Sequence, residues 1–169
     1  ACRSENHPPL AEAGIRIRYN LPYIIRPQDW NANPVFHMEL DTRVSILKLH
    51  PGITPQVVSS ILCSPGPRAV ILETYGAGNA PSKEWFISLV KEAAEMGKIL
   101  LNVTQCIAGS VNMDIYATGK CLKEAGVVNG YDSTTESSLG KLFHLLGRDS
   151  DSESVKAGLE CNLRGEISK

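Results

Sequence analysis

The stretch ILETYGAGNAP, residues 71–81, joins a buried strand to a glycine-rich turn and decides the fold class. Ala69–Leu72 form an apolar run typical of a strand covered on both faces. Gly76 and Gly78 let the backbone turn sharply, and Asn79–Pro81 is suited to open a helix. In a parallel α/β sheet such a junction lies at the carboxyl edge, where ligands bind. We therefore expect a functional site beside this turn.

Further apolar runs follow the same pattern on both sides of this strand. VSILKLH (44–50), ILLNVTQC (99–106) and the shorter GVVNGYD (126–132) alternate with segments of helical period. Alternation of this kind is the signature of a parallel sheet covered by helices. The sequence therefore predicts an α/β fold of the Rossmann-like or flavodoxin-like kind, with a small parallel sheet of about four strands and helices on both faces.

Local signals indicate where the helices begin and end. Thr54 precedes a proline and is a typical N-cap, and Ser133 with Glu136 forms a capping box ahead of another apolar stripe. Gly97 and Gly147 stand where two helices are expected to end. These signals agree with the hydrophobic period, which supports the α/β prediction.

Residues 1–42 differ from the remainder, because they are rich in Pro and Asn and lack a helical period. We interpret this part as an extended arm or linker, and residues 43–169 as the α/β domain. Within the arm, Gly14–Asn20 alternates apolar and basic residues and predicts a strand with one wet face. We expect that strand to pair with something outside this chain.

Composition excludes several classes of function. The formal net charge is −1 without a run of like charges, so neither nucleic acid nor a membrane surface is an expected partner. No apolar run approaches the roughly 20 residues that span a bilayer. The five cysteines never form a CxxC pair, which argues against a disulfide framework or a metal site and favours reduced thiols in the cytoplasm.

Phosphate-binding motifs are incomplete. The turn resembles a GxGxxG fingerprint, but Pro81 occupies the third glycine position and no acidic residue ends the next strand. Gly119 and Lys120 lack the other parts of a phosphate loop. A nucleotide cofactor is therefore not expected.

Four residues at predicted strand ends are candidates for a site. Asn79 offers a donor and an acceptor suited to an amide, a carboxylate or an amino group, or else it is a helix N-cap. Tyr116 lies in a polar loop that carries function or is only a solvated connection. Cys106 is a nucleophile or a ligand contact, or else a small buried hydrophobe. Glu73 lies on an apolar strand, where its carboxylate needs a partner or water.

Five motifs in order resemble the C-terminal domain of cytosolic, type I L-asparaginases over residues 43–166. They are TYGAGNAP (74–81), NVTQC (102–106), GSVNMDIYATG (109–119), AGVVNGYDSTTESSLGKL (125–142) and NLRGE (162–166). The upstream PLAEAGIRIRYN (9–20) resembles the strand that ends the family's N-terminal domain.

This resemblance implies a role within a larger enzyme. Members hydrolyse asparagine to aspartate and ammonia without metal or organic cofactor, as homodimers or homotetramers. Their N-terminal domain supplies a threonine nucleophile from a TGGT-type motif, and a Thr, Asp and Lys set from a GTDT motif and beyond. Neither motif occurs here. We expect this chain not to turn over asparagine alone, but to lend Asn79 and Tyr116 to a neighbouring active site.

Some bacterial members also bind asparagine at an allosteric site through a cysteine and an arginine. Cys106 matches that cysteine, but Glu73 stands where the arginine would be, so we expect no such binding. The ETYG form is similar to the animal branch, whose members also carry a lysophospholipase label. The alternative from another class is a non-catalytic module that binds a protein or a small amide.

Overall fold

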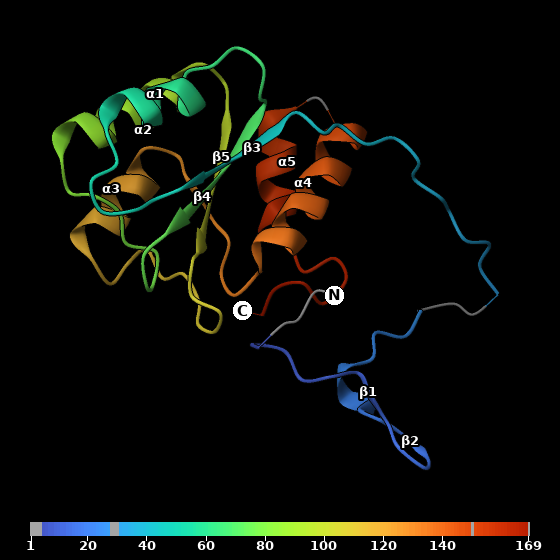
Figure 1. Cartoon of the computed structure of the whole chain (residues 1–169). Helices are drawn as coiled ribbons and strands as arrows, with labels where there is room; N and C mark the ends of the chain where they lie inside the picture. The colour runs from blue at the N-terminus through green and yellow to red at the C-terminus, as the bar shows by residue number, and fades with distance from the viewer. Residues whose placement is uncertain (1–4, 28–30, 150, 169) are drawn as a thin grey trace.

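The computed structural model describes residues 5–27, 31–149 and 151–168. Its centre is a four-stranded parallel sheet (Figure 1). The strands follow one another in chain order, as β3 (Val44–Lys48), β4 (Ala69–Thr74), β5 (Ile99–Thr104) and β6 (Val128–Asn129). The predicted α/β fold with about four parallel strands is confirmed.

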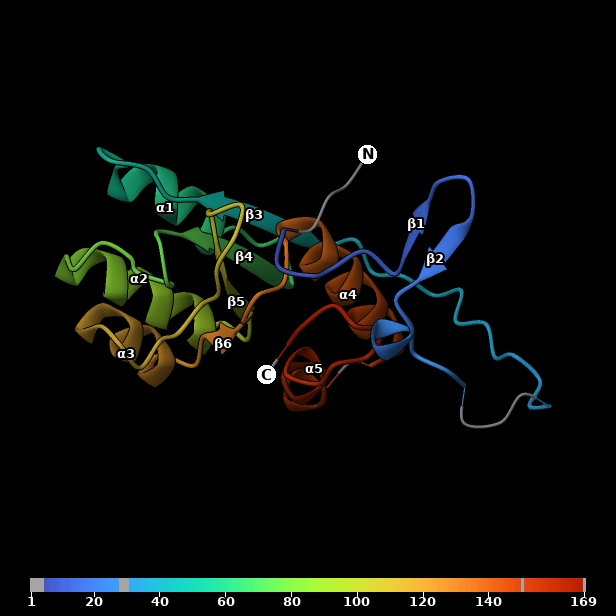
Figure 2. The ribbon, with the colours of Figure 1, turned by 90° about the horizontal axis from the view of Figure 1, so that it is seen from below.

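Helices cover both faces of this sheet, as Figure 2 shows. Each parallel crossover is right-handed by preference, so strands added in order place their connecting helices on one face. That face carries α1 (Pro55–Leu62), α2 (Glu84–Glu95) and α3 (Ala117–Glu124), and the chain then returns across the other face as α4 (Thr135–Arg148) and α5 (Ser152–Leu159).

The core is accordingly split in two by the sheet. Val70 and Leu72 of β4 pack among the residues under α1 to α3, whereas Ala69 and Ile71 pack under α4 and α5. This alternation follows the period of two of a strand, and all four side chains are fully buried. Two buried faces explain why this strand is a continuous apolar run.

Two predicted helix ends need correction. Thr54 caps α1 as expected, but α4 is capped by Thr134, whose Oγ1 accepts from Ser137 N at 3.2 Å. Ser133 is not the cap, since its hydroxyl instead meets that of Ser138 at 2.5 Å. Gly147 does not end α4, which continues to Arg148.

Gly147 has a packing role instead. A Cβ atom at this position would lie 2.4 Å from the carbonyl oxygen of Glu39, in the extended segment that precedes β3. The absence of a side chain lets that segment lie directly on α4, where Asp41 N donates to Phe143 O at 3.1 Å. Asp41 also pairs with Arg43 at 2.6 Å and with Arg68 at 3.1 Å, and hydrogen bonds from Arg43 hold the pKa of Asp41 well below its usual range.

The amino-terminal arm forms a hairpin of its own (Figure 1). Strand β1 (Ala11–Ala13) pairs antiparallel with β2 (Ile17–Tyr19), and the short 3₁₀ helix η1 (Leu21–Tyr23) follows. Part of Gly14–Asn20 therefore pairs within the chain through one edge, and pairing outside the chain stays a prediction. The strand finds its partner a few residues upstream, yet all six paired residues are exposed.

The C-terminal segment is tied to α4 by a buried ion pair. Lys141 Nζ donates to Glu166 Oε1 at 2.7 Å and to the carbonyl oxygens of Leu159 and Cys161 at 2.8 and 2.5 Å. Burial alone would raise the pKa of Glu166, but the hydrogen bonds from Lys141 and from backbone N–H groups outweigh it and lower the pKa from 4.5 to about 2.

This ion pair predicts an acid-sensitive contribution to stability. A carboxyl whose pKa falls from 4.5 to about 2 on folding stabilises the fold by about 3 kcal/mol above pH 4.5, and this is lost as the pH drops towards 2. Glu166→Gln should lower the free energy of unfolding by about that amount at pH 7 and by much less at pH 3. Urea unfolding of both proteins across this pH range measures the difference, and an equal loss at both pH values would contradict the assignment.

Gly147 and Gly140 provide a matched pair of substitutions on α4. Gly147→Ala should cost about 1–3 kcal/mol of unfolding free energy, because the new methyl group meets the backbone of residue 39. Gly140→Ala should instead add about 0.5–1 kcal/mol, since its Cβ would enter open space and alanine favours a helix. Urea titrations at pH 7 check both, and a Gly147→Ala protein as stable as the Gly140→Ala protein would disprove the close contact.

Candidate functional site

The glycine turn after β4 is closed by its own backbone. Tyr75 N donates to Asn79 O at 2.8 Å, and Asn79 N returns a hydrogen bond to Tyr75 O at 2.8 Å. Gly78 has a φ of +97°, and a Cβ there would lie 2.6 Å from Val111 Cγ1. Only glycine meets both demands, so the turn is packed against the loop that follows β5.

A buried polar chain positions this turn from the inside of the sheet. Thr74 Oγ1 donates to Asn102 Oδ1 at 2.6 Å, and Asn102 Nδ2 donates to Gly78 O at 3.2 Å. Both side chains are fully buried. Our sequence reasoning did not select them, although a polar residue near the end of each of two adjacent apolar strands is the signal that could have found them.

Asn79 is not a helix N-cap, and the prediction that Asn79–Pro81 opens a helix is wrong. Helix α2 begins four residues after Ala80, at Glu84, and its N-cap position is Lys83. Asn79 Oδ1 accepts from Ala80 N at 3.1 Å and from the hydroxyl of Thr118. Because a backbone N–H can only donate, these contacts fix the amide with Nδ2 on its other side.

That Nδ2 group makes no hydrogen bond within residues 5–27, 31–149 and 151–168. Asn79 is half-buried at the carboxyl edge of the sheet. The donor is not buried, so it is available to a carboxylate or amide oxygen.

Tyr116 lies at the start of α3, the helix that also holds Asn79. It occupies the N-cap position with half of its surface exposed, and Thr118 follows in the first turn. The Thr118 hydroxyl links Asn79 to this turn, so the structure brings the two predicted residues to one end of the domain. Tyr116 itself makes no hydrogen bond to Asn79 among the described residues.

Cys106 and Glu73 contact different residues. Cys106 is exposed, so its interpretation as a small buried hydrophobe is wrong, and its N–H donates to Thr104 Oγ1 at 3.0 Å. Glu73 has the partners that its apolar strand required, since it accepts from Thr135 Oγ1 at 2.6 Å and lies 3.4 Å from Lys48 Nζ.

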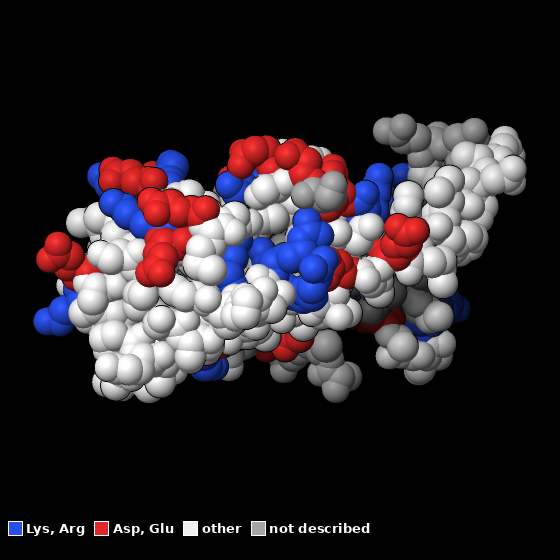
Figure 3. Space-filling view, turned by 90° about the horizontal axis from the view of Figure 1, so that it is seen from above, with Lys and Arg blue, Asp and Glu red and all other residues white. Residues whose placement is uncertain are grey.

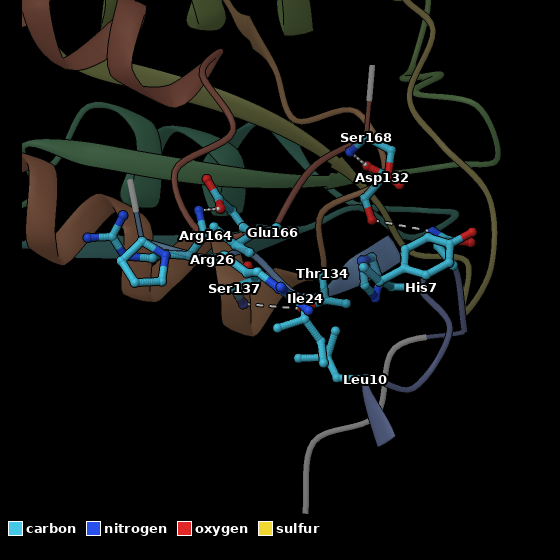
Figure 4. Close-up of a pocket in the computed structure, with 15 residues that line it drawn as sticks. His7, Leu10, Ile24, Arg26, Asp132, Thr134, Ser137, Arg164, Glu166 and Ser168 are labelled. Carbon is cyan, nitrogen blue, oxygen red and sulfur yellow. Dashed lines mark hydrogen bonds between the residues drawn. The ribbon is translucent and has the colours of Figure 1, made fainter. Parts of the chain in front are cut away.

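A cavity lies elsewhere, between the arm and the C-terminal segment (Figure 4). It measures about 780 Å³ and is bounded by Leu10 and Ile24 of the arm and by Arg164 and Ser168. None of the four predicted site residues lines it.

Other classes of site lack support in the part of the chain that the structure covers. No cluster of three or more His, Cys, Asp or Glu side chains is placed to hold a metal ion among these residues. No helix within the described ranges is long and apolar enough to cross a membrane. On the face shown in Figure 3, Lys and Arg lie beside Asp and Glu, without one continuous basic surface.

Comparison with known proteins identifies the domain. The family described as Glutaminase/Asparaginase C-terminal domain matches residues 43–159. The chain belongs to this family. The matched residues include the turn at Tyr75–Asn79 and Thr118.

Similar proteins include bacterial L-asparaginases and a mammalian lysophospholipase. L-asparaginase 1 of Escherichia coli K12 is 40% identical over 168 residues, which cover 99% of this chain and 48% of that protein. The mouse 60 kDa lysophospholipase is 37% identical, covering 97% of this chain and 29% of that protein. L-asparaginase I from Vibrio cholerae has a TM-score of 0.85 at 40% identity, over 97% of this chain and 49% of that structure. The chain thus spans about half the length, or less, of the relatives it matches.

The buried polar chain under the turn can be tested by removing one hydroxyl. Thr74→Val keeps the shape of the side chain but leaves Asn102 Oδ1 buried without its donor, which should cost about 1–3 kcal/mol of unfolding free energy. Thr42→Val, at an exposed position, should change it by less than about 0.5 kcal/mol. Urea unfolding measures both, and a neutral Thr74→Val protein would show that the chain does not support the turn.

Proposed function

We propose that this chain forms the C-terminal half of an L-asparaginase, which hydrolyses asparagine to aspartate and ammonia in the complete enzyme. In this proposal Asn79 and Tyr116 complete an active site whose nucleophile lies in an N-terminal catalytic domain. The observation that carries it is the Asn79 amide at the carboxyl edge, whose Oδ1 is held by Ala80 and Thr118 and whose Nδ2 donor makes no hydrogen bond among the described residues.

The chemistry of these residues suits substrate binding rather than bond cleavage. A fixed amide donor can hold the carboxylate or the amide oxygen of asparagine, and a half-exposed phenol beside it can limit access of water. The threonines nearest to this site are already engaged. Thr104 Oγ1 donates to Gly76 O at 2.6 Å and Thr118 donates to Asn79, so neither is paired with a general base.

The proposed assembly rests on the apolar side chains that are exposed along the arm. We propose that residues 1–42 end the N-terminal domain and link it to the α/β domain of residues 43–169, in a cytoplasmic homodimer or homotetramer. These exposed apolar side chains support the proposal that a partner domain or subunit covers the arm. They include Ile15, Ile17, Tyr19, Val35, Phe36 and Met38.

We further propose that the domain lacks the bacterial type of allosteric asparagine site and belongs with the animal branch. Glu73 supports the first point, because its carboxylate is held in place by Thr135 and Lys48 and would repel the carboxylate of a ligand near Cys106. The ETYG form at residues 73–76 supports the second. The identities of 40% with the bacterial and 37% with the mouse relative do not separate the branches.

Ammonia release from asparagine tests this proposal. The chain alone should give none, and a mixture with the N-terminal half of Escherichia coli L-asparaginase 1 should recover hydrolysis. In that mixture Asn79→Ala should lower kcat/KM by about 10- to 100-fold, the loss expected for one hydrogen bond to a charged group. Gln56→Ala, an exposed amide on α1, is the matched control and should leave kcat/KM unchanged.

Two outcomes would contradict the proposal. Hydrolysis by the chain alone would require a nucleophile within these residues. An inactive mixture in which gel filtration shows a stable complex would instead favour the non-catalytic module that binds a protein or small amide.

A further inference from the structure

A second, smaller groove of about 380 Å³ runs along the outer side of α4. The helix contributes Gly140, His144 and Arg148, and the C-terminal segment contributes Leu163 and Arg164. Gly140 leaves open space where a side chain would otherwise stand. The groove has the size of a small-molecule site and shares none of the carboxyl-edge residues proposed for asparagine.

Two of the three permanent cations that line this groove, Arg148 and Arg164, have no ion pair among the described residues, whereas Lys141 is paired with Glu166. Among residues 5–27, 31–149 and 151–168, Arg148 forms no ion pair, and Arg164 uses one nitrogen on its neighbour's carbonyl, Leu163 O, at 2.7 Å. Glu166 also lines the groove, but Lys141 and two backbone N–H groups already occupy its carboxylate.

His144 lies in the same groove as Arg148 and Arg164. Its ring meets that of His37, from the extended segment before β3, edge-on with centroids 5.6 Å apart. Burial lowers the pKa of His144, and the charges of Arg148, His37 and Arg164 lower it further. Three separate segments of the chain therefore bring basic side chains to one place.

A simpler explanation covers only part of this cluster. Arg148 is in the last turn of α4, where a cation interacts favourably with the helix dipole. That reason does not apply to Arg164 or His37, which come from other segments. The carboxylate of Glu136 at the start of the groove lies twelve residues before Arg148, about 18 Å along a helix, too far to neutralise it.

We propose that this groove binds a phosphate group, with Arg148 and Arg164 contacting its oxygens and His144 beside it. Guanidinium groups offer paired donors that match phosphate oxygens, and a dianion balances two permanent positive charges. The apolar side of the groove, at Gly140 and Leu163, leaves room for a small organic substituent. The ligand is therefore free phosphate or a small phosphate ester.

Binding of a dianion should also cause His144 to take up a proton. In the free protein the lowered pKa keeps His144 mainly neutral at pH 7, and a nearby dianion raises that pKa. Affinity should then increase as the pH falls from 8 to 6. His37, Arg148 and Arg164 oppose protonation of His144, whereas Glu136 is distant and Glu166 is occupied by Lys141.

Calorimetric titration of the chain with inorganic phosphate at pH 7 tests the proposal, with chloride at matched ionic strength as the baseline. Binding should be saturable with one site, and Arg148→Gln or Arg164→Gln should each raise Kd at least tenfold. Lys91→Gln, an exposed cation on α2, is the matched control and should change Kd by less than twofold. Glycerol 3-phosphate distinguishes the sources, since tighter binding than phosphate assigns the site to an ester and equal binding to free phosphate.

Sulfate serves for the pH series because it stays doubly charged between pH 6 and 8. The unmodified chain should bind it more tightly at pH 6, and His144→Gln should remove this dependence. The absence of saturable binding would overturn the proposal, as would an equal loss in Lys91→Gln and Arg148→Gln. Neither result depends on asparagine hydrolysis, so it leaves the proposed function untouched.

Discussion

The constraint on which the structure depends is that β4 must be buried on both faces. Its residues Ala69–Leu72 are completely inaccessible to water, and each large apolar side chain contributes about 1.5–3 kcal/mol by leaving water. A strand in this position needs helices above and below it, which the chain supplies as α1 to α3 on one face and α4 with α5 on the other. Polar groups can enter such a strand only near its end, and only with partners.

Those partners connect the core to the candidate site. Thr74 donates a hydrogen bond to the side chain of Asn102 inside the sheet, and Asn102 donates in turn to the carbonyl oxygen of Gly78. The turn then places Asn79 where Thr118 can hold it, so the first turn of α3 is joined to the end of β4. A surface amide is thus positioned by buried hydrogen bonds, which is the usual requirement for a binding group with a defined direction.

The parts of the fold that could be predicted from sequence are those with local causes. Apolar runs located the strands, and Thr54 and Gly97 marked helix ends because their effects act within one turn. Gly147 was misjudged because its reason is the backbone of Glu39, distant in sequence. Ser133 and Thr134 offer the same hydroxyl one position apart, and only the path of the chain decides which one caps α4.

The candidate site was predictable to a similar degree. Asn79 and Tyr116 stand at strand and helix ends that periodicity can locate, but their roles there stay predictions. Thr118 could not be selected from spacing, because its contact with Asn79 depends on how the loop after β5 folds back. The hairpin partner of Gly14–Asn20 was missed since Ala11–Ala13 is too short to show a period.

The ion pair between Lys141 and Glu166 holds the C-terminal segment against α4, on the other face of the sheet from α1 to α3. Glu166 pairs with Lys141 inside the protein and anchors the segment that carries Arg164, whose guanidinium forms no ion pair among the described residues. Stability and surface charge therefore come from the same few residues. An exposed guanidinium next to an anchored backbone loses little freedom when it binds an anion, so the buried carboxylate prepares the groove without contacting a ligand.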